Sequence, residues 1–263
     1  MRAVLSFLKL LKPLRYIFFV ELLIGYLVAM PPSSYPEGAG ILLAVFASFQ
    51  ILLYSGIYII NDLCDLSWDR QHPVKQHRPL AAGMISPRIG LMTAVAFILS
   101  GLTLGYWVNS TVFMFEIGFL LLNLLYSERL RNIAYWDLFG NVITHPLRVI
   151  FGVCIFGYLK IEHWPIIACT ALLAASIGLL KRYKELDEVG GCSRPSLRKY
   201  SRKGLLLVGI SCILGNLIFL FFAITPVDLS WIAFSAFLCV IAWIGYTSCT
   251  GKAKALTNYL LAS

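Results

Sequence analysis

Three aspartates, Asp62, Asp65 and Asp69, follow one another at the end of a long apolar segment. In a helix, residues at i, i+3 and i+7 project from one face, so we expect their carboxylates to be neighbours. Carboxylates so close repel one another, and desolvation beside an apolar helix raises the cost. A divalent cation bound between the carboxylates would remove this cost. A single aspartate at this place could be an ordinary solvated acid. Oxygen-only ligands favour Mg²⁺, which commonly joins one or two carboxylates to a substrate phosphate, so the three aspartates are predicted metal ligands.

Cationic side chains crowd the segment that follows the aspartates. Acid and base together suit a metal-bridged diphosphate, because the metal neutralises one side while Arg or Lys donates to the other. Taken alone, these cations would be ordinary topology signals of a membrane protein. Their position beside three carboxylates makes them candidate substrate ligands. The candidates of this first loop are Asn61, Arg70, His72, Lys75 and Arg78.

A second long polar connection, residues 182–204, takes the place in the second half of the chain that residues 61–88 take in the first. Lys181 and Arg182 stand where it begins, and they could bind phosphate but equally fit the charges that flank a membrane helix. Glu185 and the two acids at positions 187 and 188 could instead be metal ligands. The pattern leaves both interpretations open.

The elements that must position these residues are membrane helices. Hydrophobic residues make up 59% of the chain, charged residues only 13%, and the mean hydropathy is +0.79, well outside the range of soluble domains. A spanning helix needs about 20 apolar residues. Long apolar runs without alternating polar residues indicate helices rather than a β-barrel, so the predicted fold is all-α, a single transmembrane domain over residues 1–263. Eight segments qualify, namely residues 14–30, 41–60, 89–108, 112–126, 138–159, 164–180, 205–224 and 229–246.

Lys and Arg gather in alternate connections, which predicts that both termini and both long loops lie on the cytoplasmic face of an inner membrane. Topology and anionic headgroups then explain the net charge of +9, and no basic soluble domain suggests nucleic-acid binding. The connections at residues 31–40, 109–111, 160–163 and 225–228 carry almost no cations. Equivalent loop positions suggest two four-helix halves whose loops meet over a cavity.

The first loop resembles a known motif. The run NDLCDLSWDR, followed by RPLAAG, is similar to the first aspartate-rich motif of the UbiA superfamily of intramembrane prenyltransferases. Lys12-Pro13 with Arg15 resembles the N-terminal basic-proline element of that family, and Tyr126-Ser127 with Arg131 resembles its Y-S-x-x-L-K segment. The family has nine helices, one more than the eight found here.

Within the superfamily, the pattern is most similar to the decaprenyl-phosphate phosphoribosyltransferases. The segment D-R-x-H-P-x-K-x-x-R-P is present from Asp69 to Pro79, L-R-x-I-x-G contains Arg148, and K-R-Y-x-E-L begins at Lys181. Relatives that prenylate aromatic acceptors carry a second aspartate-rich motif at this last place, where cations stand here. A buried Arg in a membrane helix, such as Arg148, is usually functional.

The resemblance implies Mg²⁺-dependent transfer of 5-phosphoribose from 5-phosphoribosyl 1-diphosphate to a polyprenyl phosphate in the bilayer, with release of diphosphate. The lipid phosphate is already anionic, so no strong general base is needed. A homo-oligomeric neighbour could replace the missing helix. The implied catalytic residues are Asp62, Asp65, Asp69, Lys181, Arg182 and Glu185, and the further substrate ligands are Tyr126, Arg131, Arg148 and Tyr183.

Two other functions fit the same helices. A conventional UbiA enzyme would move a prenyl group from its diphosphate to an aromatic acceptor, and the first motif alone does not separate the two reactions. A transporter or scaffold is the third interpretation, but transporters usually keep their membrane acids near the midplane, whereas these charges cluster at one face.

Overall fold

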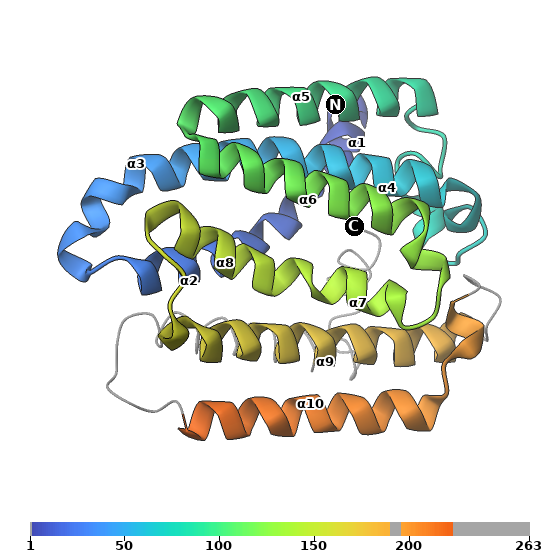
Figure 1. Cartoon of the computed structure of the whole chain (residues 1–263). Helices are drawn as coiled ribbons and strands as arrows, with labels where there is room; N and C mark the ends of the chain where they lie inside the picture. Colours follow the sequence, from blue (N-terminus) through green and yellow to red (C-terminus); the bar gives the residue numbers. More distant parts are fainter. Residues whose placement is uncertain (1, 190–195, 223–263) are drawn as a thin grey trace. The chain divides into compact units, whose positions relative to one another are not determined.

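Helices are the regular elements of the described chain. The computed structural model describes residues 2–189 and 196–222, and contacts divide these residues into two units (Figure 1). Unit 1 comprises residues 2–19 and 37–128, and unit 2 comprises residues 20–36, 129–189 and 196–222. The prediction of an all-α chain is confirmed for the described residues.

In unit 1, α4, α5 and α6 run side by side (Figure 1). Polar caps explain where two of them begin: the Ser86 side chain accepts a hydrogen bond from the Ile89 N–H, and Asn109 Oδ1 accepts one from the Val112 N–H. The elements of this unit are α1 (Arg2–Leu11), η1 (Pro13–Phe18), α3 (Tyr35–Val45), the π-helix η3 (Phe46–Leu53), α4 (Tyr54–Asp69), η4 (Lys75–His77), α5 (Pro87–Val108) and α6 (Ser110–Glu128).

In unit 2, α9 packs along α10 and also contacts α7 and α8. One core cluster joins Ile24 to Val149 and Ile167, and another joins Leu179 to Leu197. The elements of this unit are α2 (Phe19–Ala29), η2 (Pro32–Ser34), η5 (Leu130–Asn132), α7 (Trp136–Val142), α8 (Thr144–Phe156), η6 (Ile161–His163), α9 (Trp164–Val189), η7 (Leu197–Lys199) and α10 (Arg202–Phe222).

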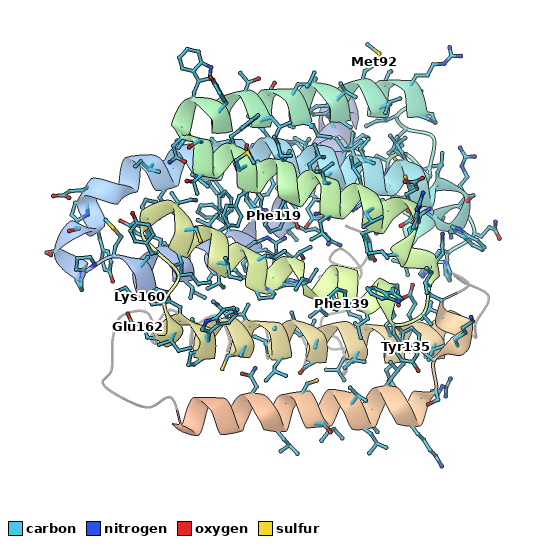
Figure 2. All side chains as sticks on the ribbon, in the orientation of Figure 1. Met92, Phe119, Tyr135, Phe139, Lys160 and Glu162 are labelled. Carbon is cyan, nitrogen blue, oxygen red and sulfur yellow. The ribbon has the colours of Figure 1, made fainter. Side chains whose placement is uncertain are left out.

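Five of the described helical segments are long and apolar enough to cross a membrane. Large apolar side chains such as Met92 and Trp107 lie on their exposed surface, as expected of helices solvated by lipid; Figure 2 shows Met92 pointing outward from α5. The chain is an integral membrane protein. The five segments are Pro32–Asp69, Pro87–Val108, Ser110–Asn132, Trp136–Phe156 and Ile161–Tyr183.

Two of the expected boundaries were wrong. The first expected span, residues 14–30, is divided between η1 and the eleven-residue α2. The expected connection at residues 31–40 is largely helical, because α3 begins at Tyr35 with Pro36 and Glu37 in its first turn, where proline and an acidic residue both favour a helix start. The span expected at residues 205–224 lies mainly in α10, and the span at residues 229–246 lies outside the described residues.

Candidate active site

The three predicted aspartates occupy one buried face of α4. This helix continues to Asp69, beyond the apolar segment that ends near Ile60. The side chains of Asp62, Asp65 and Asp69 are 3%, 7% and 2% exposed, whereas Cys64 between them is exposed. The expectation that the carboxylates share a helix face is therefore confirmed.

Arg78 from the first loop bridges two of these aspartates. Its Nη1 atom lies 3.1 Å from Asp62 Oδ1 and 2.7 Å from Asp69 Oδ2, so one guanidinium spans two turns of α4. Burial lowers the pKa of Arg78, but the carboxylates of Asp62 and Asp69 outweigh that effect and leave the pKa above its usual value. Arg78 therefore remains a cation at the acidic face.

Lys12 supplies a second cation to the same site. It stands between α1 and η1 in a left-handed conformation (φ 53°), and its Nζ atom lies 2.8 Å from Asp62 Oδ1. The ammonium group also lies 5.6 Å from the centre of the Tyr58 ring. Burial and the neighbouring Arg78 lower the pKa of Lys12 to about 7, although Asp62 opposes this shift.

A magnesium ion fits this arrangement through Asp62. Asp62 Oδ2 is buried and has no hydrogen-bond partner among the described residues, which is the condition expected of an oxygen that serves as a ligand. The three carboxylates do not converge on one point, since no group of three acidic, His or Cys side chains within the described ranges could hold a metal. Asp62 and Asp65 could therefore hold Mg²⁺ together with substrate oxygens, while Asp69 is engaged by Arg78.

The other candidates of the first loop lie at different depths. Arg70 is exposed, and Lys75 is half-buried. His72 is buried, and its Nδ1 atom accepts hydrogen bonds from the backbone N–H groups of Val74 and Lys75 at 3.2 and 3.4 Å, which shapes the loop. Asn61 Oδ1 accepts a hydrogen bond from Ser127 of α6, next to the half-buried Tyr126.

In unit 2, a second polar cluster surrounds Asp137 in the first turn of α7. The carboxylate is fully buried and accepts a hydrogen bond from Arg182 Nε at 2.8 Å. The Tyr200 hydroxyl donates to the other oxygen at 2.5 Å, and Ser196 Oγ lies 3.5 Å from the first. Burial and the contact with Asp137 raise the pKa of Tyr200, so its hydroxyl remains protonated and acts as a donor.

Three further candidates of this region lie in α9. Arg182 also donates through Nη1 to Glu185 Oε2 at 3.0 Å, so two carboxylates offset its charge. Lys181 is exposed, and Tyr183 packs against the core cluster around Leu179. The side chains at positions 187 and 188 lie outside the described residues.

Arg148 also belongs to unit 2, where it forms a buried ion pair. Its Nη1 atom lies 2.8 Å from Glu21 Oε2, and His145 Nδ1 lies 2.6 Å from the other oxygen of the same carboxylate. Gly25 and Gly152 bring α2 and α8 into backbone contact one turn farther along each helix. The described contacts of Arg148 therefore give it a role in joining these two helices.

Comparison with known proteins identifies the family. The model of the UbiA prenyltransferase family matches residues 18–257. The chain belongs to the UbiA prenyltransferase family. The resemblance found in its first loop is therefore confirmed.

Individual relatives and solved structures agree. The chain is 26% identical to the decaprenyl-phosphate phosphoribosyltransferase of Mycolicibacterium smegmatis over 76% of this chain and 64% of that protein. It is 27% identical to nodulation protein NoeC of Azorhizobium caulinodans over 60% of this chain and 52% of that one. The structure of a UbiA homologue from Archaeoglobus fulgidus bound to GPP and Mg²⁺ matches with a TM-score of 0.69 and 20% identity, over 92% of this chain and 87% of that chain. This last likeness shows the UbiA fold.

Two acidic residues of these clusters, Glu21 and Asp137, were not predicted. Each is an isolated acid in or beside an apolar segment, a signal that usually marks a paired or functional residue. Lys12 was noticed only as part of a family element, although a basic residue next to Pro13 in an otherwise apolar stretch was visible in the sequence. The sequence separation is 124 residues from Glu21 to its partner His145, 45 from Asp137 to Arg182 and 50 from Lys12 to Asp62. Only the tertiary structure could identify these partners.

Proposed function

We propose that this chain transfers the 5-phosphoribosyl group of 5-phosphoribosyl 1-diphosphate to a polyprenyl phosphate. The observation that carries the proposal is the cationic second loop, where Arg182 engages Glu185, the acid that could have completed a second metal cluster. Prenyl diphosphate chemistry calls for metal-binding carboxylates at that place, whereas a donor with an additional phosphate calls for cations. The similarity to the mycolicibacterial phosphoribosyltransferase supports the same choice.

In this reaction, a lipid phosphate oxygen forms a bond to the anomeric carbon as the bond from that carbon to the diphosphate breaks. The electron pair leaves with the diphosphate, so negative charge grows on the leaving group and positive charge on the sugar. Mg²⁺ bound at the first loop supplies charge neutralisation for the leaving diphosphate. Its proposed ligands are Asp62 and Asp65, with Asp69 as a further candidate.

The residues of this chain bind and orient the donor. Asp69 holds Arg78 through a 2.7 Å ion pair, which fixes a guanidinium beside the proposed metal ligands. Lys12, in its protonated form, adds a second positive charge at 2.8 Å from Asp62. Fixed cations of this kind stabilise a leaving diphosphate without reorganisation during the reaction. Arg70, Lys75, Arg131 and Lys181 remain predicted contributors to phosphate binding.

Two reaction mixtures test the proposal. Purified protein with Mg²⁺ receives either ribose-labelled 5-phosphoribosyl 1-diphosphate and a polyprenyl phosphate, or labelled prenyl diphosphate and an aromatic acid. We expect label in the lipid product of the first mixture. Product from the second mixture alone would contradict the proposal and support an aromatic prenyltransferase.

A further inference from the structure

Arg15 of η1 lies in unit 1, beside the acidic face of α4. Its guanidinium carbon lies 4.8 Å from the centre of the Tyr58 ring, which the Lys12 ammonium also approaches, at 5.6 Å. Lys12 pairs with Asp62, but no described carboxylate forms an ion pair with Arg15. The buried Nε atom of Arg15 has no hydrogen-bond acceptor among the described residues. The described part of unit 1 therefore leaves the charge of Arg15 without an anionic partner.

Positive charge is concentrated around this arginine. Arg78 and Arg15 both repel the ammonium group of Lys12. Asp62 does not relieve this repulsion fully, because Lys12 and Arg78 already share its Oδ1 atom. A bound anion would relieve it, and a phosphate group matches the planar hydrogen-bonding fork of a guanidinium.

The position of Arg15 along α4 indicates which substrate supplies that phosphate. Tyr58 comes four residues before Asp62, so Arg15 stacks on a residue about 6 Å closer to the apolar part of the membrane span. The next residue, Tyr16, shares a hydrogen bond of 3.0 Å with Ser55, three residues farther in the same direction. A phosphate that enters from the bilayer would therefore meet Arg15 before it reaches the aspartates.

η1 also has a face that is open to lipid. Residues three apart lie on the same face of a 3₁₀-helix, and Leu14 and Ile17 are 40% and 41% exposed. Arg15 follows Leu14 in the chain and lies over Tyr58 of α4. A molecule dissolved in the bilayer can thus approach Arg15 along η1, whereas a water-soluble donor would enter from the polar end of α4.

We propose that Arg15 binds the phosphate of the polyprenyl acceptor and holds it on the membrane side of the acidic face of α4. The inference rests on the proposed function, in which a phosphate oxygen of the lipid attacks the anomeric carbon as the diphosphate departs. Attack and departure take place on opposite sides of that carbon, because the reacting orbitals must be aligned. Arg15 on the membrane side and Asp62 and Asp65 on the polar side satisfy this requirement.

Steady-state kinetics of Arg15→Gln test the assignment. We expect the KM for polyprenyl phosphate to rise about tenfold or more, because a charge-assisted hydrogen bond to phosphate is lost. The KM for 5-phosphoribosyl 1-diphosphate should stay within about twofold of the wild type. Arg88→Gln is the matched control, because it makes the same change at an exposed arginine of unit 1, in the first turn of α5, and neither KM should change. In Arg15→Gln, a rise in the donor KM alone, or an equal rise in both, would overturn the inference.

Thermal unfolding with a short-chain isoprenyl phosphate measures binding without turnover. In the absence of donor, this lipid should raise the unfolding midpoint of the wild type and of Arg88→Gln, but not that of Arg15→Gln. The corresponding isoprenol, which lacks the phosphate, should stabilise the wild type less. Equal stabilisation of the wild type and Arg15→Gln by the isoprenyl phosphate would overturn the inference.

Arg15→Lys covers the case in which Arg15→Gln does not fold. Lysine keeps the positive charge but lacks the planar fork, so we expect a smaller rise in the acceptor KM and no change in the donor KM. An acceptor KM equal to that of the wild type would overturn the assignment. A wild-type protein that transfers no phosphoribose instead overturns the proposed function, and the unfolding measurement separates that failure from a failure of Arg15 to bind the lipid phosphate.

Discussion

At the scale of single residues, Asp65 of α4 offers a test of the proposed metal site. Asp62 and Asp69 both hold ion pairs to Arg78, so their removal would disturb the first loop as well as any metal. Asp65 lies between them on the same buried face and 7% of its side chain is exposed. Asparagine there keeps the shape of the side chain and removes its charge, so this replacement tests the proposed metal ligand.

Asp65→Asn should lower turnover by about a hundredfold or more, because it removes an anionic ligand of the Mg²⁺ that would neutralise the leaving diphosphate. The amide is isosteric, so the midpoint of thermal unfolding without Mg²⁺ should match that of the wild type. The stabilisation that Mg²⁺ gives the wild type should be lost, as thermal unfolding with and without the ion will show. Unchanged turnover would remove Asp65 from the metal site.

The Glu21–Arg148 pair allows a second test at this scale. Glu21→Gln leaves Arg148 buried without its carboxylate, and breaking such a pair costs about 3–5 kcal/mol. Replacing both partners, as in Glu21→Leu with Arg148→Met, should recover most of that loss, because no buried charge remains. Thermal unfolding of the single and double variants measures this difference.

The activity of the double variant then assigns Arg148. If the ion pair only joins α2 to α8, the stable double variant keeps its turnover. A double variant that is stable but inactive would support the original prediction that Arg148 binds substrate, and would contradict a purely structural role.

At the scale of elements, α2 and α8 approach through glycine. A Cβ atom added to Gly152 would collide with the backbone oxygen of Leu22, and one added to Gly25 would collide with that of Val149. Small residues at such a crossing let membrane helices approach closely, which lengthens their van der Waals contact. This close approach also brings Glu21 within reach of Arg148.

Gly152→Ala should therefore destabilise unit 2, because the added methyl group would meet a backbone atom that cannot move aside. Gly118→Ala is the matched control, since a Cβ atom there meets nothing within 4 Å and alanine favours a helix by about 1 kcal/mol. Thermal unfolding should show a lower midpoint for Gly152→Ala and an equal or higher one for Gly118→Ala. Equal midpoints in the two variants would contradict the close crossing.

Local patterns predicted α4 well and its partners poorly. The spacing of Asp62, Asp65 and Asp69 is a property of one helix, so the shared face could be inferred from periodicity. Which cation reaches which carboxylate depends on the path of the loop that carries Arg78, and no short-range rule gives that path. The contact of Asp137 with Arg182, which joins α7 to α9, could not be predicted for the same reason, because it depends on how two separate helices pack.

Helix boundaries show the same division between local and tertiary control. A connection was expected at residues 31–40, but Pro36 lies in the first turn of α3, where its missing N–H costs nothing. In the first expected span, Pro13 opens η1 after the left-handed Lys12, and α2 begins only at Phe19. Hydropathy located both segments but did not fix their ends.

At the scale of the whole molecule, the family assignment and the helical architecture agree. Composition predicted a membrane protein, and five described segments have the length and apolarity to cross a bilayer. The cytoplasmic location of both termini stays a prediction from the distribution of Lys and Arg. The central claim therefore concerns which diphosphate we propose that this member of the UbiA family uses.

A competition between donors measures that choice directly. Purified protein with Mg²⁺ receives 5-phosphoribosyl 1-diphosphate, a prenyl diphosphate, polyprenyl phosphate and an aromatic acid together, and mass spectrometry identifies the lipid products. We predict polyprenyl phosphate enlarged by one phosphoribosyl group, formed by the wild type and nearly absent with Asp65→Asn. A prenylated aromatic acid as the product that depends on Asp65 would contradict the account.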